Sequence, residues 1–388
     1  MIASIVAMVC VAATGPVVLR AGETPPSGHV ASVSIEGVVV KPPKSDLDLG
    51  GATIIGWDRV RRVEGDLAQE AEQYATIADR AWRARTRLER GDFPSAERLL
   101  EGLFDTYEGR VGPTAAMVAE GLLRARLRRG AQTRAVRPWL ALLASRNGPG
   151  PRWLDQDWSR EANLPPVIDP RTGLAPSLAP IWLEDQAVDP RVASVGGGAN
   201  EPGESSPLSG IDALGALYRF AARFENSPGG AMPEIDRSDP GVALVGDVVA
   251  ARTGDPDARA TARKALRERL TDEAPDWLAA WCHVGIGRSL LREPEEDDRR
   301  LGVIELLEVP ARLSVSQPYL AGVALAEAAV AMRELGDVRG AEVLHAELLD
   351  GYAGHPALNW DPIRNWPDHV LPDAPGQADA GPPTRNGA

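Results

Sequence analysis

Hydrophobic positions along the chain change their period near residue 66, which divides the sequence into a short β part and a long helical part. Apolar and polar side chains partly alternate over 29–40, and a second apolar run follows at 52–57. Alternation with a period of two is typical of strands. We therefore predict a small β-hairpin element over 29–64, which would be marginal alone and should pack on the segment that follows it.

From Asp66 onward, apolar residues recur at intervals of three and four, as on one face of an amphipathic helix. The clearest stripe runs from Ala96 to Tyr107. The spacing predicts a first helical array of two hairpins over 66–146 and a second array over 208–356. In the second array, one helix begins at Leu208, and paired helices are expected at 240–252 and 256–271, 276–291 and 297–308, and 318–335 and 338–352.

A proline-rich segment, 147–207, separates the two arrays. Its ten prolines exclude a continuous helix or a central strand. It also contains Trp153, Trp158 and Trp182, whereas disordered segments are usually poor in aromatic residues. We therefore predict an ordered, irregular arm over 151–185 that lies on the helices, and a flexible linker over 194–207. The Pro-, Gly- and Asp-rich composition of 361–388 predicts a disordered tail.

The first 21 residues have no charge before Arg20 and are mostly apolar. They are interpreted as a secretory signal peptide or a membrane anchor, although a basic start is missing. A lipoprotein signal ending at Cys10 is a further alternative, but Val9 is bulky where a small residue is expected. The segment predicts an exported protein, periplasmic or envelope-associated, with possible membrane association through this end of the chain.

A short motif recurs where hairpins are expected to turn. GDFPSAERLL at 91–100 matches GDVRGAEVLH at 336–345, and a weaker copy begins at Gly130. The Gly can take the left-handed conformation that ends a helix, and the Asp can accept hydrogen bonds at the start of the next one. The small Ala that follows allows two helices to approach closely, and a large residue four positions later fills the neighbouring groove.

These residues resemble the second half of the tetratricopeptide repeat (TPR) motif, whose helix hairpins stack into a superhelix. The matching positions are Ala96 and Leu100, Ala135 and Trp139, and Ala341 and His345. The first-helix part of the motif is only approximated, and the 39-residue spacing from Gly91 to Gly130 exceeds the usual 34. The resemblance implies a mostly α, TPR-like α-solenoid that binds proteins or peptides in a concave groove and is not an enzyme. Besides this solenoid, the chain would contain the small N-terminal β element and the long, irregular Pro/Gly-rich insert.

The composition excludes several classes of function and binding site. The formal charge of −13 over 388 residues argues against a general nucleic-acid binder. Only three residues are lysines, and none forms a phosphate-binding G-x-x-x-x-G-K-[ST] loop. Beyond Cys10 the only cysteine is Cys282, which excludes thiolate zinc clusters. Its neighbour His283 would point to a different helix face, so packing explains the pair better than catalysis. No cofactor or metal is expected.

The first array is mildly basic within this acidic chain. Residues 58–137 contain 16 arginines and 13 acidic residues. Arginines at helical spacing give a candidate partner-binding face for an acidic peptide or polymer, formed by Arg80, Arg83, Arg87, Arg90, Arg124 and Arg128. The alternative is a solvated face whose arginines pair with Glu89, Glu97 and Glu101.

The sequence therefore favours a non-enzymatic protein–protein interaction scaffold of the cell envelope. One alternative is a helical-toroid hydrolase acting on polysaccharide with carboxylates from the 147–207 arm. A clustered pair of buried carboxylates with raised pKa values in a cleft would favour it. Another alternative is a purely structural component of an envelope complex.

Overall fold

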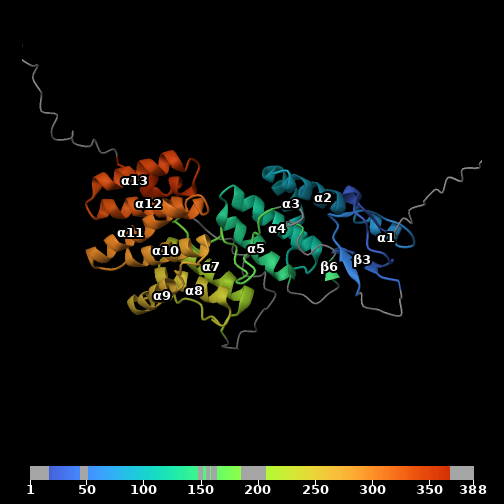
Figure 1. The fold of residues 1–388 in the computed structure, drawn as a ribbon, viewed down its shortest axis with the longest axis horizontal. Helices are drawn as coiled ribbons and strands as arrows, with labels where there is room; N and C mark the ends of the chain where they lie inside the picture. The colour runs from blue at the N-terminus through green and yellow to red at the C-terminus, as the bar shows by residue number, and fades with distance from the viewer. Residues whose placement is uncertain are drawn as a thin grey trace, which may run out of the picture.

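The protein is elongated and mostly helical, with a small β element at one end and two helical arrays following it along the long axis (Figure 1). The computed structural model describes residues 17–43, 51–146, 152–153, 158, 164–184 and 207–367. In this part of the chain no helix is both long and apolar enough to cross a membrane.

Two small sheets form the β element. In the first, β1 (Val17–Leu19) pairs antiparallel with β5 (Val60–Val63). The second has the order β2 (His29–Ser34), β3 (Gly37–Lys41), β4 (Thr53–Ile55) and β6 (Arg152–Trp153). The β2–β3 hairpin and the β3–β4 pair are antiparallel, and β6 joins β4 in parallel. The predicted hairpin is therefore present, and the arm adds its last strand.

The β element packs on the first helical array through the tight turn between β2 and β3. Tyr107 donates a hydrogen bond to the Ile35 carbonyl at 2.7 Å, and Thr114 donates one to the Glu36 carbonyl at 2.8 Å. Gly37 is required here because its φ is +145° and a Cβ atom would lie 2.1 Å from the Ile55 carbonyl oxygen. This docking gives the small sheets the support that they lack alone.

The last residues of the predicted signal or anchor segment, 1–21, belong to the folded part of the chain. Val17 and Leu19 are buried in β1, and a short 3₁₀ turn, η1 (Arg20–Gly22), follows. A cleavage site at residue 21 would remove a strand from the first sheet. Residues 1–16 lie outside the described residues, so cleavage and anchoring both stay predictions.

The helices of the first array follow the predicted hairpins. They are α1 (Ala68–Glu72), α2 (Ala75–Glu89), α3 (Phe93–Tyr107), α4 (Pro113–Arg128) and α5 (Gln132–Arg146). Pro138 interrupts the hydrogen bonding inside α5, because it lacks an N–H group for the Arg134 carbonyl. Arg126 donates a hydrogen bond to that carbonyl at 2.7 Å, so α5 continues without an orphaned acceptor.

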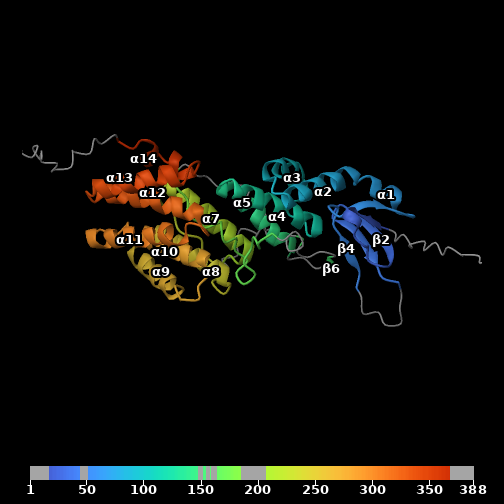
Figure 2. The ribbon, with the colours of Figure 1, turned by 45° about the horizontal axis from the view of Figure 1, so that its top comes forward.

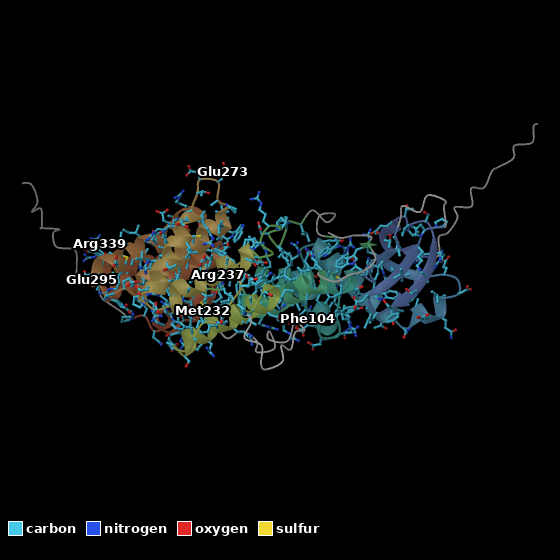
Figure 3. All side chains as sticks on the ribbon, turned by 90° about the horizontal axis from the view of Figure 1, so that it is seen from below. Phe104, Met232, Arg237, Glu273, Glu295 and Arg339 are labelled. Carbon is cyan, nitrogen blue, oxygen red and sulfur yellow. The ribbon has the colours of Figure 1, made fainter. Side chains whose placement is uncertain are left out.

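The second array contains single helix α7 followed by three hairpins and a short terminal cap. The elements are α7 (Gly210–Asn226), α8 (Pro240–Thr253), α9 (Pro256–Glu268), α10 (Asp276–Leu290), α11 (Glu296–Leu313), α12 (Pro318–Glu334), α13 (Val338–Gly351), η3 (Pro356–Asn359) and α14 (Asp361–Arg364). Charged residues project from its surface, Glu273 and Glu295 from loops and Arg339 from the first turn of α13 (Figure 3).

The repeated turn motif has the geometry that its sequence predicts. Gly91, Gly130 and Gly336 have φ values of +76°, +74° and +84°. In each turn the N–H after the glycine bonds to the carbonyl five residues earlier at 2.9 Å. Asp92 and Asp337 then accept hydrogen bonds from backbone N–H groups in the first turn of α3 and α13. These are the helix-ending and helix-starting devices expected of a Gly-Asp pair.

Successive helices pack against each other in chain order, and the first helices of neighbouring hairpins also touch: α2 with α4, and α10 with α8 and α12. Glycine makes the closest approaches. A Cβ atom at Gly287 would lie 2.9 Å from the Gly302 carbonyl oxygen, so α10 and α11 meet backbone to backbone. Gly287 thus allows the close approach of these two helices.

The predicted disordered tail, 361–388, begins with structure. Helix α14 buries Ile363, and Trp366 stacks on His345 with ring centroids 4.3 Å apart. These apolar side chains give residues 361–367 a packed position that the Pro- and Asp-rich composition conceals. Residues 368–388 lie outside the described residues.

Candidate functional site

Residues 164–184, the longest described stretch of the arm, run between the two arrays (Figure 2), and several of their side chains belong to the main hydrophobic core. Leu174, Leu178, Ile181 and Trp182 are fully buried although the segment contains neither helix nor strand. This is the ordered, irregular packing that the tryptophans of the arm predict. The flexible linker expected at 194–207 lies outside the described residues up to residue 206.

Helix side chains hold the arm by its backbone. Six side chains from five helices donate hydrogen bonds to its carbonyl oxygens: Arg124 to Pro165 (2.8 Å), Trp139 to Gly173 (3.1 Å), Trp281 to Pro176 (3.0 Å), Tyr218 to Leu178, Tyr319 to Ile181 (3.4 Å) and Arg288 to Trp182 (2.8 Å). Irregular backbone must find such partners when it is buried. The inner side of the arrays therefore holds an irregular segment of the chain by its backbone carbonyls, which are groups that every polypeptide carries.

An open groove of about 880 Å³ lies where the arm and both arrays meet. The arm contributes Pro166, the first array contributes Phe93 and Arg128, and the second array contributes Val315 and Tyr352. Val315 is 96% exposed. The groove is large enough for a ligand and combines apolar walls with a few polar groups, as binding sites generally do.

The groove has a positive character. Among the described residues, no Asp or Glu lines it, whereas three arginines do. Arg124 pairs with Glu120 at 2.7 Å and Arg129 with Glu97 at 2.6 Å. Arg128 makes no ion pair with any described residue and is exposed, so it is the guanidinium available to a bound anion.

His355 contributes no charge to the groove at neutral pH. Burial lowers its pKa to about 4. Its Nδ1 accepts a hydrogen bond from the Ala357 N–H at 3.1 Å, and its Nε2 lies 2.9 Å from the Tyr319 carbonyl oxygen. The neutral ring with a proton on Nε2 satisfies both contacts.

The six arginines of the candidate basic face do not lie together in the structure. Arg80, Arg83, Arg87 and Arg90 lie along α2 and at its end, outside the groove. Arg83 pairs with Asp79 at 3.0 Å, Arg87 pairs with Asp92 at 2.5 Å, and Arg80 donates to the Gly102 carbonyl. Only Arg124 and Arg128 of the six predicted residues line the groove.

Arg124 differs from Arg128, the other groove residue of this set, because it is buried. It lies with Arg85 near the ring of Trp158, at 5.9 and 5.8 Å from the centroid. Arg85 is on the opposite face of α2 from the other four arginines, by helical spacing. The three expected acids form ion pairs, but with arginines outside the six predicted residues: Glu89 with Arg85, Glu97 with Arg129, and Glu101 with Arg134. Helical periodicity identified these arginines, but it did not predict that the Arg124 side chain is buried against the arm.

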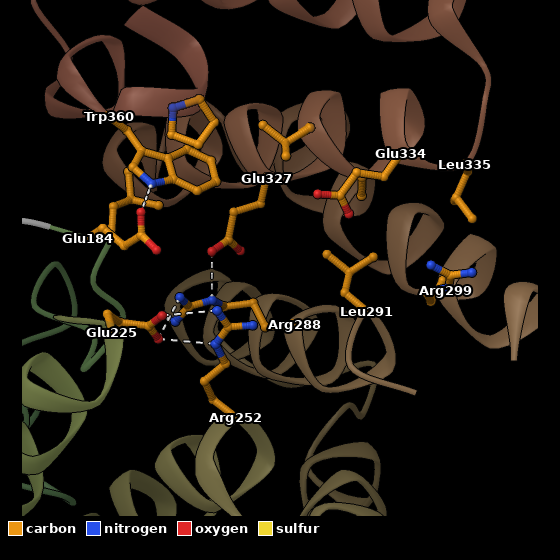
Figure 4. A pocket seen from close by; sticks show the side chains of 14 residues that line it. Glu184, Glu225, Arg252, Arg288, Leu291, Arg299, Glu327, Glu334, Leu335 and Trp360 are labelled. Carbon is orange, nitrogen blue, oxygen red and sulfur yellow. Dashed lines mark hydrogen bonds and ion pairs between the residues drawn. The ribbon is translucent and has the colours of Figure 1, made fainter. Parts of the chain in front are cut away.

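A second hollow, about 300 Å³ in volume, lies inside the second array (Figure 4). A network of four charged side chains, three of them buried, forms one side of it. Arg252 binds both oxygens of Glu225, at 3.1 and 2.9 Å. Arg288 bridges Glu225 and the Glu327 Oε1 atom, at 2.9 Å each. Sequence reasoning missed this network because its members come from four different helices, α7, α8, α10 and α12.

The two carboxylates of this network differ in ionisation. Burial opposes ionisation of Glu225, but the facing Arg288 and Arg252 outweigh it and lower the pKa of this carboxyl. Burial raises the pKa of Glu327, and the same two arginines offset only part of that effect. A glycoside hydrolase would be favoured by two carboxylates with raised pKa values. Such a pair is not formed here, because arginine binds both Glu225 oxygens and lowers the pKa of this carboxyl.

Other candidate groups have structural partners. Cys282 is fully buried, which raises its pKa to about 12, and His283 instead faces Glu305 with Nδ1 at 2.8 Å from Oε2. The two side chains do not form a catalytic pair. Within the described ranges, no three His, Cys, Asp or Glu side chains gather closely enough to hold a metal ion.

Comparison with known proteins yields no matching family model, no matching curated protein and no matching solved structure.

Proposed function

We propose that this protein is a non-enzymatic interaction scaffold built on a TPR-like solenoid, and that the groove between its arrays binds an extended, acidic segment of a partner protein. One observation carries the proposal: helix side chains already hold an irregular chain segment, the arm, through its backbone carbonyls. An array built to bind one polypeptide segment offers the same chemistry to a second segment beside it.

The groove lining supports an acidic partner segment. Its apolar walls, including Pro166, Tyr352 and the exposed Val315, favour burial of apolar side chains. Arg128 offers the only unpaired positive charge among the described arginines of the lining, with no nearby acid in the lining to oppose it. We place the scaffold in the cell envelope on the strength of the N-terminal segment, which expression of a tagged full-length chain and cell fractionation would test.

The test is selection of peptides from a displayed random library with the full-length chain. We expect enrichment of extended peptides that contain Asp or Glu, with binding that weakens as salt is raised. Arg128→Glu should weaken binding about tenfold or more, because it replaces attraction with repulsion at the groove. Arg90→Glu is the matched control, since Arg90 is an exposed arginine outside the groove.

Photocrosslinking separates groove binding from binding elsewhere. A photoreactive residue at position 315 should capture the selected peptide, whereas one at position 343, an exposed valine of α13 outside the groove, should not. Absence of enriched peptides, or enrichment that Arg128→Glu leaves unchanged, would contradict the proposal. A chain that binds no peptide but assembles with itself would instead favour the purely structural alternative.

A further inference from the structure

The small cavity of the second array contains a carboxylate oxygen without a partner. Glu327 is 7% exposed, and its Oε1 accepts a hydrogen bond from Arg288. Its Oε2 is buried and has no hydrogen-bond partner. Figure 4 shows this oxygen on the side that faces the space between Leu291 and Glu334. A buried polar atom without a partner is costly, which makes this position unusual in an otherwise well-satisfied network.

The surroundings of Glu327 favour a donor that is positively charged. Glu184 from the arm and Glu334 from α12 also line the cavity, while Glu225 is neutralised by its two arginines. The indole of Trp360 closes one side and donates weakly to Glu184 at 3.4 Å. Acidic oxygens beside an aromatic ring are the common surroundings of ammonium and guanidinium groups.

An arginine of the same cavity has an unsatisfied donor. The Nε atom of Arg299 is buried without a hydrogen-bond partner, and Arg299 makes no ion pair with any described residue. Figure 4 shows Arg299 well separated from Glu327, with Leu291 between them. The cavity therefore has an acceptor at one end and a donor at the other.

We propose that this cavity binds a small organic zwitterion of amino-acid size, with its ammonium or guanidinium group on Glu327 and its carboxylate at Arg299. A volume of about 300 Å³ suits a single basic amino acid. The Glu327 carboxylate reaches such a ligand by rotating about its last side-chain bond, a torsion with broad minima. The cation is organic, because the described residues contain no cluster of ligands for a metal ion.

Binding should be linked to release of a proton. Burial favours the protonated form of Glu327 in the empty cavity, and an arriving cation favours the ionised form. Affinity should therefore rise with pH until Glu327 is ionised in the free protein as well. The other charged groups that face the cavity are Glu184 of the arm, Glu225 of α7, Arg252 of α8, Arg288 of α10, Arg299 of α11 and Glu334 of α12.

The experiment is titration calorimetry of the full-length chain with three probes. Agmatine carries the guanidinium without a carboxylate, L-arginine carries both groups, and succinate carries carboxylates alone. We expect arginine to bind more tightly than agmatine and succinate not to bind. At a pH where Glu327 is protonated in the free protein, titrations in buffers of different ionisation enthalpy should show proton release on binding of either cation, which a purely structural network would not produce.

Two variants assign the ends of the ligand. Glu327→Gln should lower the affinity for both cations by roughly tenfold to a hundredfold. It should also abolish proton release, because the amide cannot ionise. Arg299→Gln should remove the advantage of arginine over agmatine and leave agmatine binding unchanged. Glu308→Gln, at a glutamate on α11 outside the cavity, is the matched control and should change nothing.

The proposal would be overturned if neither cation bound at up to about 10 mM, where only very weak complexes remain undetected. Binding that Glu327→Gln leaves unchanged would overturn it as well. Far-UV circular dichroism of each variant checks folding, and the pH dependence of the unmodified chain tests the Glu327 assignment without any substitution.

Discussion

The two helical arrays use the same Arg–Glu chemistry in different surroundings. In the first array, Arg129 binds both oxygens of Glu97 at 2.8 and 2.6 Å, and the Arg129 side chain is 45% exposed. In the second array, Arg288 is 3% exposed, bridges two glutamates and leaves one oxygen of Glu327 unpaired. Exposed pairs add little to stability, whereas buried networks are costly to form and costly to break.

This difference separates a structural role from a binding role. The first network links α3 to the end of α4 and reaches the surface through Arg129, whose side chain is 45% exposed. The second network excludes water around three of its charges and still lacks a donor for Glu327. A deeply buried carboxylate that lacks a donor and lines a cavity is a better candidate for ligand binding than a network that reaches the surface. The predictions below test that contrast.

The largest expected effect is that of Arg288→Met. The substitution leaves Glu225 and Glu327 without a shared counter-charge and removes the hydrogen bond to the Trp182 carbonyl. We expect a loss of about 3–5 kcal/mol in the free energy of unfolding, measured by urea denaturation. Arg129→Met is the control and should cost no more than about 1 kcal/mol. Equal losses in the two variants would remove the contrast between the arrays.

The next effect concerns the pH dependence of stability. Because the pKa of Glu327 is raised in the folded state, the folded chain binds more protons than the unfolded chain above the ordinary glutamate pKa. Its contribution to stability is therefore present at low pH and is lost as pH rises towards the folded-state value. Glu327→Gln should flatten this part of the profile of melting temperature against pH. An unchanged profile would show that Glu327 ionises without penalty.

A smaller effect tests how the arm is held. Tyr218 is fully buried and donates a hydrogen bond to the Leu178 carbonyl. Tyr218→Phe should cost about 1–2 kcal/mol in the free energy of unfolding, because the carbonyl stays buried without a donor. Tyr74→Phe is the matched control, since the Tyr74 hydroxyl makes no hydrogen bond with any described residue. Faster hydrogen exchange near Leu178 in the Tyr218 variant would localise the effect to the arm.

The sequence predicts the local structure of this protein well and its long-range contacts poorly. Gly91 and Gly336 end helices as expected, because a left-handed residue and a cap are properties of a few neighbouring positions. The network around Arg288 joins residues 39 and 63 positions away, and no local pattern marks them as partners. Helical spacing likewise finds Arg124 and Arg80 but does not say which one faces the arm. Relative placement of helices decides those contacts, and a single sequence carries little information on it.

The smallest expected effect lies at the repeated turn, where the two arrays should behave alike. Asp337 accepts a hydrogen bond from the Gly340 N–H at 2.8 Å, and Asp92 accepts one from the Ser95 N–H at 3.3 Å. Asp337→Ala should cost about 1 kcal/mol in the free energy of unfolding, the usual loss for an N-cap. Asp92→Ala should act in the same direction.

These two caps also test whether the arrays unfold together. Val338→Ala, next to the second cap and partly exposed, controls for a change on the helix that spares the hydrogen bond. If the arrays form one cooperative unit through the buried arm, both cap variants should shift a single urea transition. Two separate transitions, each moved by only one of the variants, would mean that the arm does not couple the arrays. In that case the groove and the cavity would belong to units whose stabilities are set independently.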